Sequence, residues 1–252
     1  MESRLGSLNF RDIAVTTVYL PFCCMIGCLS YAMFFYFDEV TESKCGVHNF
    51  VPSISGAVCM RPLLHLWRFC IVAHAVPRVF VTHLYYYSHM ALADKVNSWR
   101  SYTPLVSLIY LFGLTDILSL CGLTIVSTVD NFSKITYICV FLDVHEFFFI
   151  IFGLSSLLYM TSKFYLHFRL NCQRLLPRTF KKSLADKAIF LTLMFLCGMF
   201  AAKYYYEHHI LCKPNAFSWF SIAEFGIAFA NMGFHGTAAK DFYNLKIIAS
   251  LT

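Results

Sequence analysis

The sequence predicts an all-α membrane protein, a six-transmembrane-helix bundle with both termini cytosolic. Of its 252 residues, 58% are hydrophobic and only 13% are charged, which is about half the charged share of a typical soluble domain. The hydrophobic residues fall into six segments, each near the ~20 residues that cross a bilayer core. Lys and Arg gather in the connections on one side of these segments, as the positive-inside rule requires.

The hydrophobic segments place the expected spans at approximately 13–37, 63–87, 104–127, 135–161, 187–206 and 216–239. The fifth contains KAIFLTLMFLCGMFAA and is the clearest, whereas the second carries charged residues. The first span is long and has no cleavage site after it, so we expect no cleaved signal peptide. The chain has neither an internal repeat nor a low-complexity linker, which indicates a single polytopic domain over residues 1–252.

The distribution of cations predicts the orientation of the bundle. Thirteen Lys and Arg, including Lys163 and Lys187, belong to the side with the termini and the connections 88–103 and 162–186, against five on the other side. The net charge of +6 is therefore mainly a topology signal, and we expect no nucleic-acid partner. The basic segment RLNCQRLLPRTFKK is either an ordinary cytosolic loop or a site that attracts anionic lipid.

Two cysteines lie outside the hydrophobic spans, in separate lumenal loops. Cys45 belongs to the loop 38–62 and Cys212 to the loop 207–215. The lumen of the secretory pathway is oxidising, so we predict a disulfide between them. Cys59 is a rival partner, and two free thiols are the remaining alternative. No spacing of Cys and His suggests a zinc site, and we expect no metal.

Several polar residues interrupt the spans. They are His74 and Arg78 in the second, Asp116 in the third, Asp143 and His145 in the fourth, and Glu224, Asn231 and His235 in the sixth. At 1.5 Å per residue, most of them lie roughly 12–22 Å below the lumenal surface. A charge in the bilayer core costs at least ~3 kcal/mol, and pairing in the bundle interior is the usual remedy. We therefore expect a polar cavity in which Asp116 or Asp143 faces Arg78; pairs that only fix helix packing are the alternative.

The first lumenal loop has an unusual composition. Its segment CGVHNFVPSISGAV carries little charge and several turn-forming residues, which suggests a re-entrant cap over the mouth of the bundle. The chain contains no GxSxG motif, so we do not expect a serine hydrolase with a nucleophile elbow.

Three segments carry a family resemblance. They are TESKCGVHNFVPSISGAV, WRFCIVAHAVPRVFV and CKPNAFSWFSIAEFGIAFANMGFHGTAAKDFYN. Together they resemble the post-GPI-attachment-to-proteins factor 2 family, six-helix membrane proteins of the wider FRAG/DRAM/Sfk group. The match runs in order over nearly the whole chain, although the third to fifth spans match only in spacing and character.

The resemblance implies a role in lipid remodelling of GPI anchors, in which a saturated acyl chain is restored to a lyso-GPI intermediate. It implies a location in the Golgi membrane, and in the endoplasmic reticulum membrane as a second option. The implied partners are lyso-GPI-anchored proteins, membrane lipids and other GPI-remodelling enzymes. No cofactor is implied, and the acyl donor is either acyl-CoA or a phospholipid.

Acyl transfer to a lipid hydroxyl needs a base for that hydroxyl and donors for the oxyanion. We expect His74 or His235 to be the base, oriented by Asp116 or Glu224. Either Arg68 or Arg78 would hold a phosphate through its planar fork. The further expected substrate-binding residues are Asn231, Glu224, His145 and Asp143.

Two functions remain open from the sequence. One is a membrane-embedded lyso-GPI acyltransferase, and the other is a non-enzymatic lipid-binding adaptor that presents lyso-GPI to another enzyme. A transporter is less favoured, because the chain lacks the interrupted-helix repeats of many transporters.

Overall fold

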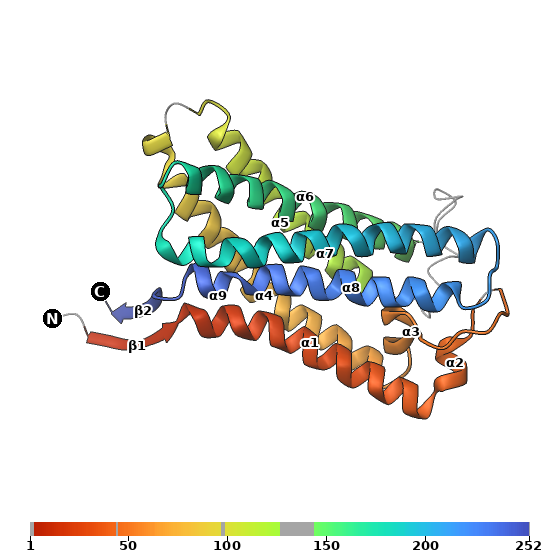
Figure 1. Ribbon diagram of the computed structural model, residues 1–252. Helices are drawn as coiled ribbons and strands as arrows, with labels where there is room; N and C mark the ends of the chain where they lie inside the picture. The colour runs from red at the N-terminus through yellow and green to blue at the C-terminus, as the bar shows by residue number, and fades with distance from the viewer. Residues whose placement is uncertain (1–2, 44, 97–98, 127–143, 252) are drawn as a thin grey trace.

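The computed structural model describes residues 3–43, 45–96, 99–126 and 144–251. Long helices run side by side along one axis and form an elongated bundle (Figure 1). The long helices are α1 (Phe10–Phe35), α4 (Leu63–Met90), α5 (Tyr102–Ile125), α6 (Val144–Cys172), α7 (Arg178–His209) and α8 (Ala216–Gly236). The short elements are α2 (Phe37–Thr41), α3 (Ile54–Val58), the 3-10 helix η1 (Ala93–Val96), α9 (Ala238–Asp241), β1 (Ser3–Asn9) and β2 (Lys246–Leu251).

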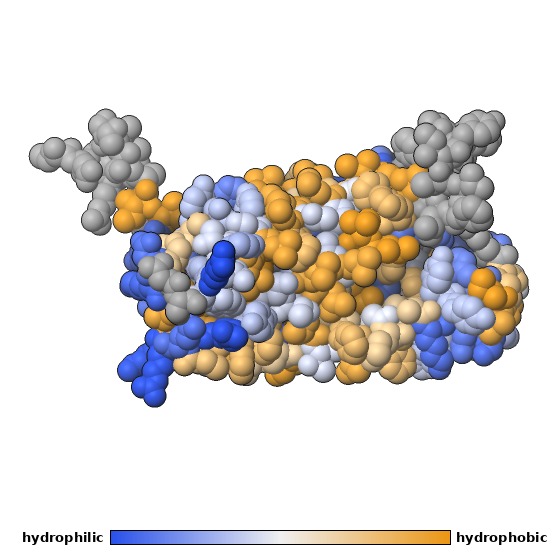
Figure 2. Space-filling view, turned by 90° about the horizontal axis from the view of Figure 1, so that it is seen from above, coloured by the Kyte–Doolittle hydropathy of each residue, from blue (hydrophilic) through white to orange (hydrophobic). Residues whose placement is uncertain are grey.

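The surface is that of a multi-pass membrane protein. Five described helices, α1 and α4 to α7, are long and apolar enough to cross a membrane. Figure 2 shows hydrophobic residues across the middle of the molecule and hydrophilic residues toward its two ends. The sixth expected span corresponds to α8, which is not among the five and carries buried polar residues. A helix pairs its own backbone groups, which is why apolar spans adopt this structure in lipid.

The expected connection 162–186 is mostly helical, which corrects the sequence analysis. Helix α6 continues to Cys172 and α7 already begins at Arg178. Lys163 and Lys187, which were assigned to the cytosolic side, are therefore inside the bundle, with exposed fractions of 2% and 0%. A hydropathy reading ends a span at its first lysine, because it does not include the side chains that will pair with that lysine.

The two ends of the described chain meet in a short sheet that the sequence analysis did not anticipate. Strand β1 pairs antiparallel with β2, and Asn9 lies opposite Lys246. Both termini consequently lie at the same end of the bundle (Figure 1). We call this the terminal end, and the opposite end, which holds α2 and α3, the cap end.

Both termini should be accessible from the cytosol, because the excess of Lys and Arg lies on their side. In sealed vesicles with the cytosolic face outward, protease should remove epitope tags from both termini without detergent. A tag in the α7–α8 connection should survive until detergent is added. A protected C-terminal tag would contradict the six-helix topology.

The segment that follows α2 folds back over the bundle as the expected cap. The backbone N–H of Asn215 donates to the carbonyl of His48 at 2.9 Å. The hydroxyl of Ser218, on α8, accepts from the N–H groups of Phe50 and Val51 at 2.7 and 3.1 Å. Helix α3 then packs its Val58 into an apolar cluster beneath the cap.

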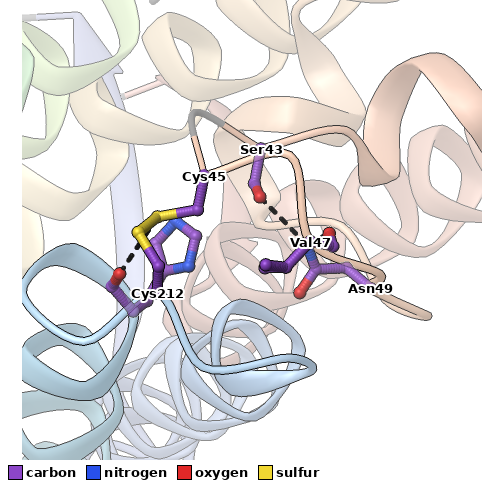
Figure 3. The surroundings of a disulfide bond; sticks show 6 residues. Ser43, Cys45, Val47, Asn49 and Cys212 are labelled. Atoms are coloured by element: carbon purple, nitrogen blue, oxygen red, sulfur yellow. Dashed lines mark hydrogen bonds between the residues drawn. A yellow bond between two sulfur atoms is a disulfide. The ribbon is translucent and has the colours of Figure 1, made fainter.

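A disulfide joins Cys45 of the cap to Cys212 after α7, which is the pair expected from the sequence (Figure 3). Beside it, the amide of Asn49 donates to the Ser43 hydroxyl at 3.2 Å. Cys59 is a free thiol that donates to a backbone carbonyl at 2.9 Å, and burial raises the pKa of this thiol. The disulfide therefore holds the cap to the loop that leads into α8.

Peptide mapping without reduction should recover SKCGVHNF linked to HILCKPNA. The bond closes a sequence separation of 167 residues, so Cys45→Ser should lower the free energy of unfolding by ~2–4 kcal/mol. Thermal unfolding in detergent measures this loss, with Cys59→Ser as the matched control. Alkylation of both Cys45 and Cys212 in unreduced native protein would refute the bond.

Candidate functional site

The side chain of Arg78 lies at the centre of the bundle and binds acceptors from two other helices. Its guanidinium forms an ion pair with Asp116 on α5. The same nitrogen, Nη2, lies 3.0 Å from Oδ1 of Asn231 and 2.5 Å from Nε2 of His235, both on α8. Arg78 is 2% exposed and Asp116 is 0% exposed. The charge of Arg78 is thus compensated by Asp116, one of the two carboxylates expected to face it; Asp143 lies outside the described residues.

The second oxygen of Asp116 is also bonded. It accepts from the hydroxyl of Ser156 on α6, and the amide of Asn231 donates to the same hydroxyl at 2.9 Å. Four helices therefore contribute to one buried network, which we call the Arg78 network. Hydrogen bonds to the remaining lone pairs help to offset the desolvation of a buried ion pair, and these contacts supply them for Asp116.

His74 lies one helical turn from Arg78 toward the cap end. Its Nδ1 is 2.5 Å from the carbonyl of Thr17 on α1, which can only accept, so the network assigns the ring proton to Nδ1. The lone pair on Nε2 then faces Arg78, whose Nη1 lies 3.3 Å away. The imidazole is thereby held in one tautomer with its basic nitrogen toward the site.

His235 occupies a different position. Its ring stacks on Tyr159, with centroids 5.0 Å apart and planes 6° apart. Its Nε2 lies 3.4 Å from Asp116 as well as next to Arg78. His235 therefore lies beside both members of the ion pair, and its Nε2 is positioned to accept from Arg78.

A cavity of about 90 Å³ opens on the Arg78 network. His74, Arg78 and Asn231 line it, whereas His235 and Asp116 are not among the described residues at its wall. Most of the wall is apolar and includes Met25, Trp67, Ile71, Leu120, Phe149, Phe152 and Ile227. Apolar walls with a few convergent polar groups are typical of a site that binds a small, largely apolar ligand.

The cap-side part of the cavity contains a second set of polar residues. Glu224 and His145 line it, together with Ser55 from α3, so the cap forms part of its wall. Glu224 accepts from the backbone N–H of Ile54 at 2.9 Å, so its bonded partner is the cap and neither of the two candidate bases. His145 holds its Nδ1 2.6 Å from the Val126 carbonyl.

The two arginines of the second span have different surroundings. Arg68 donates to the carbonyls of Thr124 and Ile125 at 3.4 and 2.8 Å, where α5 ends. Carbonyls in the last turn of a helix lack partners within the helix, and a cation there satisfies them. Arg68 is not among the described residues that line the cavity, so Arg78 is the arginine that a ligand in the cavity would meet.

A second buried cluster, nearer the terminal end, was not predicted from the sequence. Lys187 on α7 pairs with Asp241 at 2.7 Å, and Asp241 also accepts from the hydroxyl of Tyr85 at 2.5 Å. Lys163 lies over the Tyr85 ring, 3.1 Å from its centroid. A signal was available on α6, because Ser156, Tyr159, Lys163 and His167 recur at helical spacing and are all buried.

The chain is similar to known proteins over most of its length. The family model of the Frag1/DRAM/Sfk1/Cwh43P N-terminal domain matches residues 9–245. A Drosophila melanogaster protein named "Post-GPI attachment to proteins factor 2-like" is 32% identical over 237 residues, which cover 93% of this chain and 70% of that protein. The chain belongs to the post-GPI-attachment-to-proteins factor 2 family. The resemblance seen in the sequence motifs is thereby confirmed.

Other members of the family are similar over comparable lengths. "Acyltransferase PGAP2" of Xenopus tropicalis is 32% identical over 252 residues, covering 97% of this chain and 92% of that protein. "Acyltransferase PGAP2" of Danio rerio is 28% identical over 224 residues, covering 85% and 87%. No solved structure matches the chain.

Proposed function

We propose that this protein remodels GPI anchors by transferring a saturated acyl chain to the free glycerol hydroxyl of lyso-GPI, in the Golgi membrane. One observation carries the proposal: an oriented, neutral imidazole and a buried guanidinium line the same apolar cavity. The relatives whose names include "acyltransferase" support the same reaction class.

His74 is the proposed base. Its Nε2 carries a lone pair, and its contact with Nη1 of Arg78 is long, at 3.3 Å, so a substrate hydroxyl can displace that contact at little cost. Nε2 removes the hydroxyl proton as the oxygen attacks the acyl carbonyl of the donor. The new ester C–O bond forms, the donor's acyl bond breaks, and the proton passes from His74 to the leaving sulfur or oxygen.

Arg78 is the proposed stabiliser of the oxyanion. It lies near the middle of α4 and lines the same cavity as His74. Its Nε is buried and has no partner among the described residues, so a donor remains for a developing negative oxygen. This donor, in the same cavity as the proposed base, supports a role with the acyl carbonyl, and the proposed role of Arg78 therefore moves from phosphate binding, expected from the sequence, to the oxyanion.

The second candidate function is a lipid-binding adaptor that presents lyso-GPI to a separate acyltransferase. The observation that favours it is that the basic nitrogens of both candidate bases already contact Arg78: Nε2 of His74 and Nε2 of His235 both face its guanidinium. An adaptor would need the cavity and the cap but would form no product alone.

Purified protein in defined liposomes distinguishes the two. One arm supplies lyso-GPI with radiolabelled palmitoyl-CoA, and the other supplies lyso-GPI with a phospholipid labelled in its palmitoyl chain. We expect labelled diacyl-GPI in one arm, which also identifies the donor. Protein that binds lyso-GPI but forms no product in either arm would overturn the enzyme and support the adaptor.

A further inference from the structure

The cap-side part of the cavity contains a carboxylate that no cation compensates. Glu224 lines the cavity and is 8% exposed. It forms no ion pair with any of the residues that the structure describes. Within the described part of the chain, the two other buried carboxylates, Asp116 and Asp241, each pair with a cation. Glu224 therefore differs from them in having an uncompensated charge when it is ionised, which is unfavourable in an apolar site.

The cap does not need this charge. Among the residues that the structure describes, the carboxylate bonds to the cap through the N–H of Ile54, which donates to Oε2 at 2.9 Å. A neutral amide oxygen accepts such a bond equally well. A glutamine would thus hold the cap, and the acidity of Glu224 is left without a structural explanation.

A second group in the cap-side part of the cavity is also a hydrogen-bond acceptor. His145 lines the same part of the cavity, and because its Nδ1 donates to the Val126 carbonyl, its Nε2 is left as an acceptor. Glu224 lies two helical turns from Asn231 along α8, about 10 Å toward the cap end. The cavity thus has a cation, Arg78, at its inner end and an unpaired anion about 10 Å nearer the cap.

We propose that Glu224 binds a primary ammonium group in the headgroup of the acceptor lipid and thereby selects amine-bearing glycolipids. This rests on the proposed function, because the acceptor is the lyso-lipid whose reacting end lies at Arg78 and His74. The headgroup extends from there toward the cap, and its ammonium supplies the cation that Glu224 lacks. The other N–H groups of the ammonium can donate to acceptors in the cap-side part of the cavity, such as Nε2 of His145.

Binding to two synthetic lyso-lipids tests the proposal. The probes are glucosaminyl-lysophosphatidylinositol and its N-acetylated analogue, which lacks the positive charge. Wild-type protein in nanodiscs should bind the amine at least about 10-fold more tightly, a difference of about 1.4 kcal/mol. Glu224→Gln should bind both lipids with the lower affinity and should melt at the wild-type temperature, because it keeps the bond from Ile54.

Glu207→Gln is the matched control. Glu207 lies at the cap end of α7, pairs with Lys213 at 3.3 Å, and is not among the described residues that line the cavity. This variant should keep the full preference for the amine.

Equal binding of the two lipids by wild-type protein would overturn the role of Glu224 and leave the proposed function intact. That comparison needs no variant, so it holds even where Glu224→Gln does not fold. Binding of neither lipid by folded wild-type protein would overturn the proposed function and the subsite together. A preference that persists in folded Glu224→Gln would refute the assignment of the subsite to this residue.

Discussion

Asp116→Asn should lower the free energy of unfolding by about 3–5 kcal/mol, because it leaves the buried Arg78 without a countercharge. Arg78 is 2% exposed and has no other carboxylate within ion-pair distance among the described residues. Asparagine is nearly the same size as aspartate, so the loss reports charge and not volume. Thermal unfolding in detergent and the yield of folded protein measure it.

A double variant separates charge balance from other effects. Arg78→Met combined with Asp116→Leu removes both charges, and it should recover most of the stability lost in Asp116→Asn, while remaining inactive. Ser156→Ala, which removes a neutral donor to the same carboxylate, should cost only about 1–3 kcal/mol. If Asp116→Asn melts at the wild-type temperature, the ion pair is not a major determinant of stability.

His74→Gln should lower reacylation at least about 100-fold, since general-base catalysis typically contributes 10²–10⁴-fold. Glutamine can still bond to the Thr17 carbonyl but cannot take up the hydroxyl proton. The measurements are formation of labelled diacyl-GPI in liposomes and loss of lyso-GPI in cells that lack the endogenous protein. Binding of lyso-GPI and the melting temperature should stay near the wild-type values.

His65→Gln is the control for this prediction, because His65 is an exposed histidine on the same helix. It should retain full activity. His235→Gln tests the other candidate base, which is not among the described residues that line the cavity. Full remodelling by well-expressed His74→Gln would exclude His74 as the base; loss in His235→Gln alone would move the catalytic role there, and activity in both would favour the adaptor.

Much of the site was predictable because it depends on local sequence. The spacing of Glu224, Asn231 and His235 places them on one side of a helix, and the structure buries all three on α8. Arg78 could be expected to have a carboxylate partner, because an unpaired charge is unstable in a bilayer core. The rotation of the helices against one another decided which carboxylate pairs with Arg78. It also decided that Asn231 and Ser156 bond to that carboxylate.

The two buried lysines show which helix boundaries an average of local hydropathy cannot predict. A hydropathy average counts Lys163 and Lys187 as ends of spans, and so it shortens α6 and α7. Their partners, Tyr159 for Lys163 and Asp241 for Lys187, are respectively close and distant in sequence. Tyr159 lies one helical turn from Lys163, so the helical spacing in the sequence indicates this pair. No local pattern indicates the pairing of Lys187 with Asp241.

Composition, the lengths of the hydrophobic segments and the motifs near Cys45, Arg78 and His235 were sufficient by themselves for the all-α membrane class and the family, and they favoured the Cys45–Cys212 disulfide over its alternatives. These features depend on which residues occur and at what local spacing, and hydropathy and helical periodicity are local properties. Only the tertiary structure decided that Asp116 is the partner of Arg78, that Glu224 bonds to the cap, and that His74 lines the cavity while His235 stacks on Tyr159. Each of these is a contact between separate helices or with the cap, and such contacts depend on the rotation, depth and packing of whole elements, which no single segment specifies.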